Sequence, residues 1–366
     1  MKNRLIKILM AAMLISGIFP AGCSDKDNSV RAVGDWGWTP LGYGLSGSIT
    51  SEVKALCTYE GKLYAGGRFN YDGDEYVNNL AVWNDVEWAA LDEKMSTVGS
   101  SRVEALTVYE DELIVAGAFE EIGGKDYDNI AAWDGNSWSS LGSGVNSMIM
   151  CAAVYHNELI VGGLFTEAGG VSANYIAAWD GETWKPLGSG FDRYVLALEV
   201  YDGKLIAGGL FENAGGTGVN SLAAWDGHSW TPLGEGTNNV VWALTGYGDK
   251  LVAGGLFGAA GGRVIRCVAA WDGNEWSPLG GGINHTVLSL AWFEGRLIAG
   301  GYFSMAGEVA AANIAAWNGV AWEPMRLGLN SNVNALLVYE NRLIAGGRFT
   351  YADTLHANSV AAWGIQ

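Results

Sequence analysis

The side chains that most often carry catalysis or bind transition metals are few in this sequence and are spread along it. The four histidines lie far apart, with no pair four residues apart and no neighbouring cysteine: His156, His228, His285 and His356. Zinc sites and metalloproteases need such local groups of ligands. No Gly-x-Ser-x-Gly, phosphate-binding or dinucleotide-binding motif stands between a predicted strand and a helix. We therefore expect no cofactor and no catalytic residue set, which favours a binding protein over an enzyme.

One acidic segment has the composition of a cation site. Asp72, Asp74 and Glu75 lie beside Gly73 within four residues, and carboxylate oxygens at this density are ligands that Ca²⁺ prefers. Their spacing differs from that of an EF-hand loop. A solvated acidic loop is the simpler interpretation, and a calcium site is its alternative.

A polar residue recurs every 46 residues through the middle of the chain, at Asn146, Asp192, Asn238, Asn284 and Asn330. Asn and Asp often cap turns through side-chain to backbone bonds, so one interpretation is an Asx turn at each position. The alternative is a polar ring around a binding site. In that case the neighbouring residues, which differ from repeat to repeat, would set specificity: Arg193, Tyr194, Asn239, His285 and Asn332.

These positions belong to an internal repeat that is marked by a tryptophan. It recurs once after 50 residues and then five times after 46, as Trp83, Trp133, Trp179, Trp225, Trp271, Trp317 and Trp363. A Phe in the pattern Gly-Gly-x-Phe keeps the same step from Phe69 to Phe349. Repeats of this length are typical of propeller blades and of helical arrays, and the residues between the markers decide between them.

Within one repeat, short apolar runs alternate with turn signals. Residues 195–201 and 205–211 flank Asp202-Gly203, and residues 221–225 and 230–233 flank a second Asp-Gly pair. Asp-Gly between apolar runs predicts a hairpin with a type I′ turn. Each repeat is thus predicted to form two hairpins, whose strands we name a, b, c and d in chain order.

Proline and the two chain ends predict how these strands assemble. A proline lies two residues after the second Trp of five repeats, in strand d, and this favours a sheet edge because proline cannot donate to a ladder. The first strand d, at residues 38–41, precedes every strand a, whereas the last strand c, at residues 359–363, has no strand d after it. Pairing of these segments predicts an all-β fold over residues 35–366: a seven-bladed β-propeller of four-stranded blades, closed by the N-terminal strand.

The predicted topology separates the loops into two faces. The a–b and c–d turns are short and share one face, while the longer and more varied b–c and d–a connections share the other, which is the candidate binding face. Cys57, Cys151 and Cys267 fall in different repeats. We therefore predict no disulfide between them.

The repeated pattern Ala-Ala-Trp-Asp-Gly-x-x-Trp-x-Pro-Leu-Gly, together with Gly-Gly-x-Phe, spans residues 35–366. It resembles the propeller repeats of the Rax2-like cortical polarity markers of fungi and of related bacterial envelope proteins, and more distantly those of kelch and galactose-oxidase propellers. The resemblance implies the fold. It implies no functional residue, because the matching residues are scaffold residues and no Tyr-Cys-His set resembles a copper-radical site.

The N-terminal segment is typical of an export signal. Residues 1–22 combine Lys2, Arg4 and Lys7 with an apolar run over residues 8–19. Small residues before Cys23 resemble the lipobox of bacterial lipoproteins, although Pro20 departs from that pattern, and the resemblance implies that Cys23 is lipidated. Polar residues 23–34 would form a tether. We expect an exported lipoprotein of the outer membrane or cell surface.

The charge of the chain limits its partners. A net charge of −18 is repelled by nucleic acids and by anionic membranes. We expect a monomer that touches the membrane only through its lipid and binds a glycan or a cell-surface protein as a non-enzymatic, envelope-anchored module. Two alternatives stay open. A polysaccharide-active hydrolase or lyase would gather carboxylates such as Asp192 at the channel mouth, and a scaffold of an envelope assembly complex would expose an apolar patch.

Overall fold

The computed structural model describes residues 35–47, 50–91 and 101–365. These residues form strands, turns and bends, without a helix among them. Accordingly, no helix within these ranges is long and apolar enough to cross a membrane. Within these ranges, residues 36–365 belong to one compact unit. The predicted export signal, Cys23 and the tether lie outside the described residues.

The compact unit is built from four-stranded antiparallel sheets, which we call blades 1 to 7. Blade 1 contains β3 (Glu52–Tyr59), β4 (Lys62–Arg68), β7 (Leu80–Trp83) and β8 (Trp88–Ala90). Blade 2 contains β9 (Arg102–Tyr109), β10 (Glu112–Ala118), β13 (Ile130–Trp133) and β14 (Trp138–Ser140). Blade 3 contains β15 (Ile149–Tyr155), β16 (Glu158–Gly163), β19 (Ile176–Trp179) and β20 (Trp184–Pro186).

The remaining four blades repeat this pattern. Blade 4 contains β21 (Val195–Tyr201), β22 (Lys204–Gly209), β25 (Leu222–Trp225) and β26 (Trp230–Pro232). Blade 5 contains β27 (Val241–Tyr247), β28 (Lys250–Gly255), β31 (Val268–Trp271) and β32 (Trp276–Pro278). Blade 6 contains β33 (Val287–Phe293), β34 (Arg296–Gly301), β37 (Ile314–Trp317) and β38 (Trp322–Pro324). Blade 7 contains β39 (Val333–Tyr339), β40 (Arg342–Gly347), β43 (Val360–Ile365) and β1 (Trp36–Pro40).

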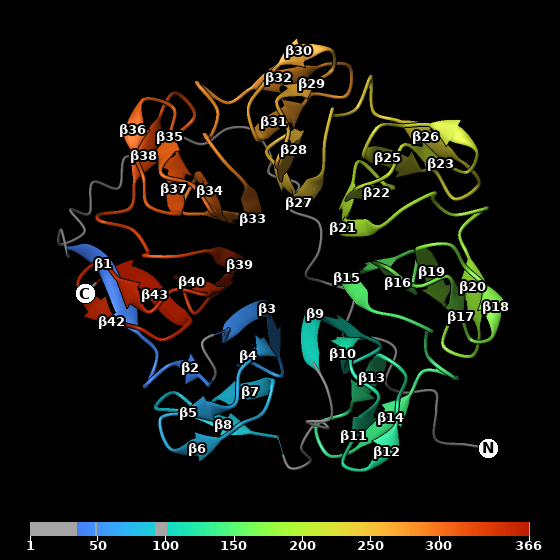
Figure 1. The fold of residues 1–366 in the computed structure, drawn as a ribbon, viewed down its shortest axis with the longest axis horizontal. Helices are drawn as coiled ribbons and strands as arrows, with labels where there is room; N and C mark the ends of the chain where they lie inside the picture. Colours follow the sequence, from blue (N-terminus) through green and yellow to red (C-terminus); the bar gives the residue numbers. More distant parts are fainter. Residues whose placement is uncertain (1–34, 48–49, 92–100, 366) are drawn as a thin grey trace, which may run out of the picture. The chain divides into compact units, whose positions relative to one another are not determined.

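The blades are arranged in a ring, and the first strand of each faces the centre (Figure 1). Each of these inner strands contacts the inner strands of both neighbouring blades, and β39 contacts β3. The proline-containing strands lie at the outer sheet edges, as the sequence predicted. The prediction of an all-β fold of four-stranded antiparallel blades is therefore confirmed.

The two ends of the unit meet in blade 7. Strand β1 pairs antiparallel with β43, from Trp36 opposite Ile365 to Pro40 opposite Ala361. Trp38 thereby takes the place that the second Trp of the repeat has in other blades, beside Trp363. The outer strand of this blade comes from the start of the unit and its other three strands from the end.

Paired tryptophans connect each blade to the one before it. In every blade the two rings are tilted against each other, with centroids 5.0–5.5 Å apart. Six of the second indoles donate an N–H to a carbonyl of the preceding blade at 2.7–3.3 Å, as Trp276 does to Leu233. The exception is Trp138, whose buried indole nitrogen has no partner within the described residues.

The first glycine of the Gly-Gly pair allows neighbouring blades to approach closely. A Cβ at Gly208 would lie only 2.7 Å from Cγ1 of Val241 on the inner strand of the next blade. Comparable distances of 2.4–2.6 Å occur at Gly66, Gly162, Gly254, Gly300 and Gly346. These glycines are thus packing residues between blades.

The two kinds of tight turn differ, and only one matches its prediction. In the a–b turn, Asp202 and Gly203 both have positive φ, as a type I′ turn requires. In the c–d turn only Gly227 does, and Asp226 instead accepts N–H groups of His228 and Ser229 at 2.8 Å. The prediction of type I′ turns at the c–d Asp-Gly pairs was wrong, because side-chain capping stabilises a longer turn there.

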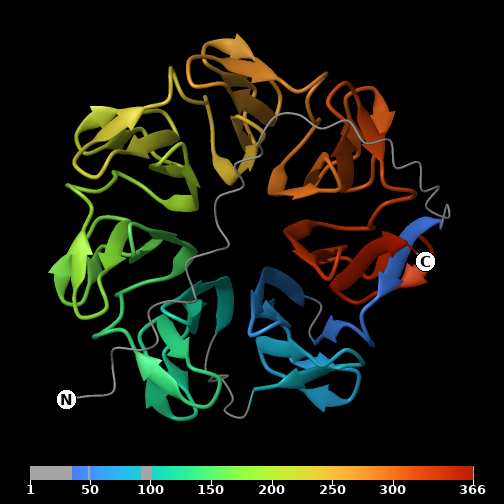
Figure 2. The same cartoon turned by 180° about the vertical axis from the view of Figure 1, so that it is seen from behind.

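A small hairpin fills each b–c connection. These hairpins are β5–β6 (Tyr71–Asp72, Glu75–Tyr76), β11–β12 (Glu121–Ile122, Lys125–Asp126), β17–β18 (Glu167–Ala168, Val171–Ser172), β23–β24 (Asn213–Ala214, Thr217–Gly218), β29–β30 (Ala259–Ala260, Arg263–Val264), β35–β36 (Met305–Ala306, Val309–Ala310) and β41–β42 (Tyr351–Ala352, Leu355–His356). The short strand β2 (Leu45–Ser46) joins the first of them. We call the side with these hairpins and the d–a connections the loop face (Figure 1), and the side with the a–b and c–d turns the turn face (Figure 2).

The three cysteines within the described residues are free thiols and lie in different blades. Cys57 is in β3, Cys151 in β15, and Cys267 directly precedes β31. Burial raises the pKa of all three thiols, that of Cys57 to about 11. They behave as small apolar residues of the blades.

Candidate functional site

The recurring Asn and Asp residues bind the loop face together. The side-chain oxygen of Asn238 accepts the N–H groups of Gly258 and Ala259, both at 2.9 Å, in the hairpin of its own blade. The same pair of bonds, 20 and 21 residues along the chain, is made at 2.8–3.1 Å by Asn146, Asp192, Asn284 and Asn330. These bonds cross to the hairpin, whereas an Asx turn would bond a local N–H. They fix the d–a connection to the b–c hairpin.

Asp192 shows how completely these side chains are used. Burial raises its pKa, but hydrogen bonds from the Asn213 side chain and from the N–H groups of Asn213 and Glu212 outweigh it and lower the pKa overall. Three donors of the hairpin hold this carboxylate: the N–H groups of Glu212 and Asn213 and the side-chain amide of Asn213. It therefore serves as a structural acceptor in blade 4.

The variable neighbours of these residues lie in two places. Tyr194 and Asn332 stand at the loop-face ends of inner strands, beside the central opening, because their carbonyls accept the N–H groups of Leu210 and Arg348. Arg193 and Asn239 line a cavity of about 410 Å³ between blades 4 and 5, together with Asn238. His285 turns back onto its own chain, where Nδ1 accepts the N–H of Thr286 at 2.8 Å.

Three positions in each blade surround the central opening on the loop face. Two are the facing residues at the loop-face ends of the first and second strands, such as Glu52 opposite Arg68. The third is the residue skipped by a β-bulge in the inner strand, such as Lys54 between the paired residues Val53 and Ala55. A bulge redirects its side chain. We call these the mouth positions.

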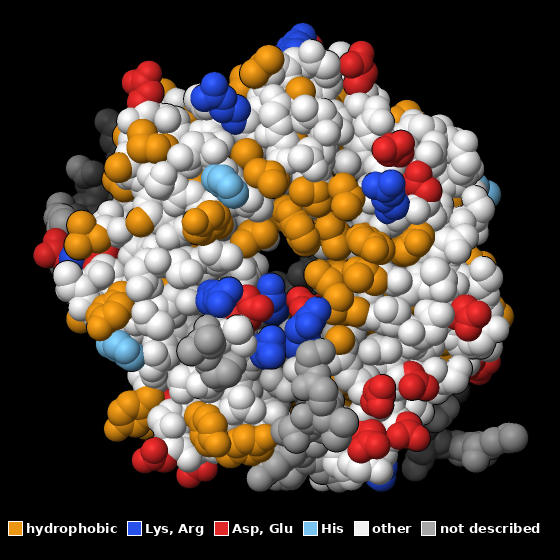
Figure 3. Space-filling model, viewed as in Figure 1, with side chains coloured by type: hydrophobic (Ala, Val, Ile, Leu, Met, Phe, Trp, Pro, Cys, Tyr) orange, Lys and Arg blue, Asp and Glu red, His pale blue; other side chains and the backbone are white. Residues whose placement is uncertain are grey.

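Blades 3 to 6 place almost only apolar and aromatic side chains at the mouth positions, and we call this set the apolar arc. Its members are Met148, Met150, Leu164, Tyr194, Leu196, Leu210, Val240, Trp242, Leu256, Thr286, Leu288 and Tyr302. Several are well exposed, including Tyr302 at 53% and Leu256 at 39%. Hydrophobic side chains accordingly gather along one side of the opening (Figure 3).

Blades 7, 1 and 2 place polar and charged side chains at the same positions, and we call this set the polar arc. Its members are Asn332, Asn334, Arg348, Glu52, Lys54, Arg68, Arg102, Glu104 and Ala118. Lys, Arg and Glu gather on this side of the opening (Figure 3). Four cations stand against two carboxylates here, in a chain whose net charge is −18.

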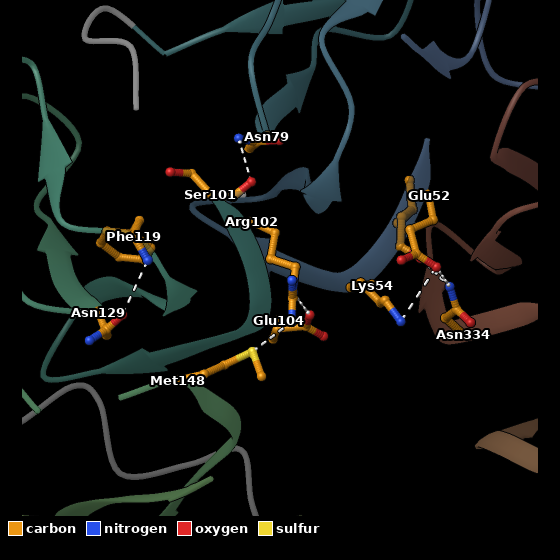
Figure 4. Close-up of polar contacts among 11 residues, drawn as sticks. Glu52, Lys54, Asn79, Ser101, Arg102, Glu104, Phe119, Asn129, Met148 and Asn334 are labelled. Atoms are coloured by element: carbon orange, nitrogen blue, oxygen red, sulfur yellow. Dashed lines mark hydrogen bonds and ion pairs between the residues drawn. The ribbon is translucent and has the colours of Figure 1, made fainter. Parts of the chain in front are cut away.

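The carboxylates of the polar arc are already paired (Figure 4). Oε2 of Glu52 lies 3.4 Å from Nζ of Lys54 and accepts a hydrogen bond from Nδ2 of Asn334 at 3.2 Å. Glu104 pairs with Arg102, whose guanidinium also contacts Sδ of Met148 at 3.1 Å. Among the described residues of this arc, cations outnumber carboxylates by four to two.

Most of the mouth residues were not among those predicted from the sequence. Tyr194 and Asn332 were predicted as candidate binding residues, but none of the charged residues of the polar arc was. The signal was present in the residue between Gly-Gly and Phe, which reads Arg68, Ala118, Leu164, Leu210, Leu256, Tyr302 and Arg348 through the repeats. Comparing each repeat position around the ring would have found the division.

The acidic loop of blade 1 has a structural explanation for one of its residues. Asp72 is buried, and its Oδ2 accepts the N–H of Trp88 at 2.7 Å. Burial raises the pKa of Asp72, against the effect of N–H bonds from Trp88 and Tyr43. Asp74 and Glu75 are exposed at the hairpin turn. In the part of the chain that the structure describes, no three His, Cys, Asp or Glu side chains are grouped to hold a metal.

Two solved structures show the fold by comparison. The chain is similar to the WD40 β-propeller domain of Doa1, with a TM-score of 0.54 and 12% identity over 91% of this chain and 98% of that one. It is also similar to the computationally designed Ika8 protein, with a TM-score of 0.50 and 17% identity over 89% of this chain and 100% of that one. No protein-family model matches, and no curated protein matches. The comparisons support a β-propeller, and the Rax2-like and kelch-like resemblance gains nothing from them.

Proposed function

We propose that this chain is a non-enzymatic binding module of the cell envelope that holds its partner at the mouth of the loop face. The observation that carries the proposal is the contrast between repeat positions. Tryptophan pairs and interblade glycines stay nearly constant around the ring, while the mouth positions change from blade to blade. In a repeat scaffold, such local variation on one face is where specificity is placed.

The chemistry of the apolar arc favours a protein partner over a glycan. Sugars bind to exposed aromatic rings flanked by hydrogen-bonding groups, whereas this arc is mainly Leu, Met and Val. Exposed apolar surface of this kind is typical of protein interaction sites. It is also the feature expected of an assembly scaffold, so scaffold and binding module converge on the same surface.

A screen with the full chain tests this proposal. Binding would be measured on glycan, polysaccharide and envelope-protein arrays, with chromatography of the sugars to detect cleavage. We expect binding that Tyr302→Ser on the loop face weakens and Val320→Ser, on a c–d turn of the same blade, leaves unchanged. Both side chains are exposed, at 53% and 84%. Binding that only the Val320 variant weakens would contradict the proposal.

One observation favours a hydrolase or lyase as the second candidate. Glu212 and Glu235 line the same cavity between blades 4 and 5 as Arg193, and paired carboxylates are the groups that glycoside hydrolysis uses. Cleavage of a polysaccharide by the full chain, lost in both Glu212→Gln and Glu235→Gln, would replace the binding module with this enzyme.

The envelope anchor is part of the proposal and rests on the sequence. Cys23 follows an export signal and small residues that resemble a lipobox. Lipidation would place the propeller at the outer membrane or cell surface. We expect labelled palmitate to enter the full chain and not its Cys23→Ala variant, and the variant to leave the membrane fraction. Equal labelling of both would exclude this anchor.

A further inference from the structure

The mouth combines two surfaces that demand different things from a ligand. The exposure of Leu210, Leu256 and Tyr302 to water is unfavourable. Contact with apolar groups of a ligand would bury these side chains and lower the free energy. The polar arc, directly beside the apolar arc around one opening, carries four cations against two carboxylates among its described residues. A single ligand that spans the opening must therefore be apolar on one side and anionic on the other.

We propose that the loop-face mouth binds an extended acidic polypeptide segment, with its apolar side chains on the apolar arc and its carboxylates on the polar arc. This inference rests on the proposed function and gives its partner a chemistry. An acidic polysaccharide would suit the positive charge of the polar arc but would leave Leu196, Leu256 and Leu288 without apolar partners. A polypeptide supplies both kinds of group at the short spacing of successive side chains.

The existing ion pairs strengthen the choice of an anion. Glu52 and Glu104 are each engaged by a cation of their own strand, so an incoming lysine or arginine would have to displace Lys54 or Arg102. An incoming carboxylate meets guanidinium groups instead, and Arg binds carboxylates through two parallel hydrogen bonds. The acidic bulk of the protein repels a like-charged ligand elsewhere and so leaves this arc as the favoured point of arrival.

Three labelled decapeptides test this with the full chain by fluorescence anisotropy. The first alternates Leu or Phe with Glu, the second replaces each Glu with Lys, and the third replaces each Leu and Phe with Ser. We expect the first to bind at least about tenfold more tightly than either of the others. Its affinity should also fall as salt is added, because the polar arc is exposed.

Matched variants test separately whether the polar arc and the apolar arc contact the peptide. Arg68→Glu should weaken the acidic apolar peptide about tenfold, whereas Lys62→Glu, at the turn-face end of the same strand β4, should not. The double variant Leu210→Gln, Leu256→Gln should also weaken it about tenfold. Val200→Gln, whose side chain is 43% exposed on β21 against 39% for Leu256, is the control. Unchanged binding by both loop-face variants would overturn the inference.

The remaining outcomes separate this inference from the proposed function. Equal binding of the acidic and basic peptides would overturn the assignment of charge. Tight binding of polygalacturonate, sensitive to Arg68→Glu, with no peptide bound would overturn the polypeptide and keep the binding module. If no peptide and no polysaccharide binds, the inference fails, and the proposed function then depends on the envelope-protein array alone.

Discussion

The apolar and polar arcs stand on the same backbone and differ in side chains. Both have an inner strand with a bulge and a tilted pair of indoles, one on the third strand and one on the outer strand. Yet the bulge residue is Trp242 in blade 5 and Lys54 in blade 1, and the residue after Gly-Gly is Leu256 in one and Arg68 in the other. Since the fold accepts both, the fold does not require either. The mouth is thus the part of the repeat that can vary without cost to the scaffold.

The comparison of the two arcs assumes that their blades are packed equivalently. The largest expected effect tests this assumption. Trp276→Ala in blade 5 and Trp38→Ala in blade 7 should each lower the free energy of unfolding by about 3–5 kcal/mol, because each removes a fully buried indole. Urea unfolding followed by circular dichroism measures both. Losses that differ by more than about 2 kcal/mol would show that the arcs do not share equivalent packing.

Glu199 in β21 gives a blade of the apolar arc a pH-dependent stability. Burial raises the pKa of Glu199 to about 7, from 4.5 in the unfolded chain. The folded state therefore holds this proton more tightly, and stability falls as the pH rises from about 4.5 to 7 while the group is forced to ionise. Glu199→Gln should stabilise the protein by about 1–3 kcal/mol at pH 8 and have little effect at pH 4.

The measurement is the melting temperature of both proteins across that pH range. The equivalent residues in the two neighbouring blades are Ala153 and Thr245, so the position does not require a charge. A stabilisation that is independent of pH would show that ionisation of Glu199 is not its cause.

Two polar residues of the loop face, Asn238 and Asn332, are expected to differ in their contribution to stability, and this is the next largest effect. Asn238→Ala should cost about 1 kcal/mol, because two N–H groups of its hairpin lose their acceptor to water. Asn332 stands at the mouth in the polar arc, and Asn332→Ala should change stability by less than about 0.5 kcal/mol. Chemical unfolding measures both losses of stability. Equal losses would mean that Asn238, which joins the d–a connection to the hairpin, and Asn332, at the mouth, do not differ in their contribution to the fold.

The smallest effect is expected where one arc is converted toward the other. Arg68→Leu makes blade 1 match blade 5 at an exposed mouth position. Its free energy of unfolding should stay within about 0.5 kcal/mol of the unaltered protein. A melting curve measures this, and a loss above about 1 kcal/mol would mean that the charged residue also supports the fold.

The sequence predicted the scaffold well because its determinants recur. Spacing identified the repeat, and the position of Pro232 beside Trp230 placed strand d at an edge. The site was less predictable. Asn238 was recognised as a repeated polar residue, but its partner lies 20 residues away in a hairpin whose contact depends on the folded blade. Arg68 and Leu256 carry no motif, and their meaning emerges only when seven repeats are arranged around one opening.

The pairing of β1 with β43 also determines at which face the propeller begins. Trp36 lies opposite Ile365, at the end of β1 that adjoins the c–d turns, while Pro40 leads toward the hairpins. The first strand of the propeller therefore starts at the turn face. A partner held at the mouth would bind the opposite face, so that neither end of this closing pair would have to move to admit it.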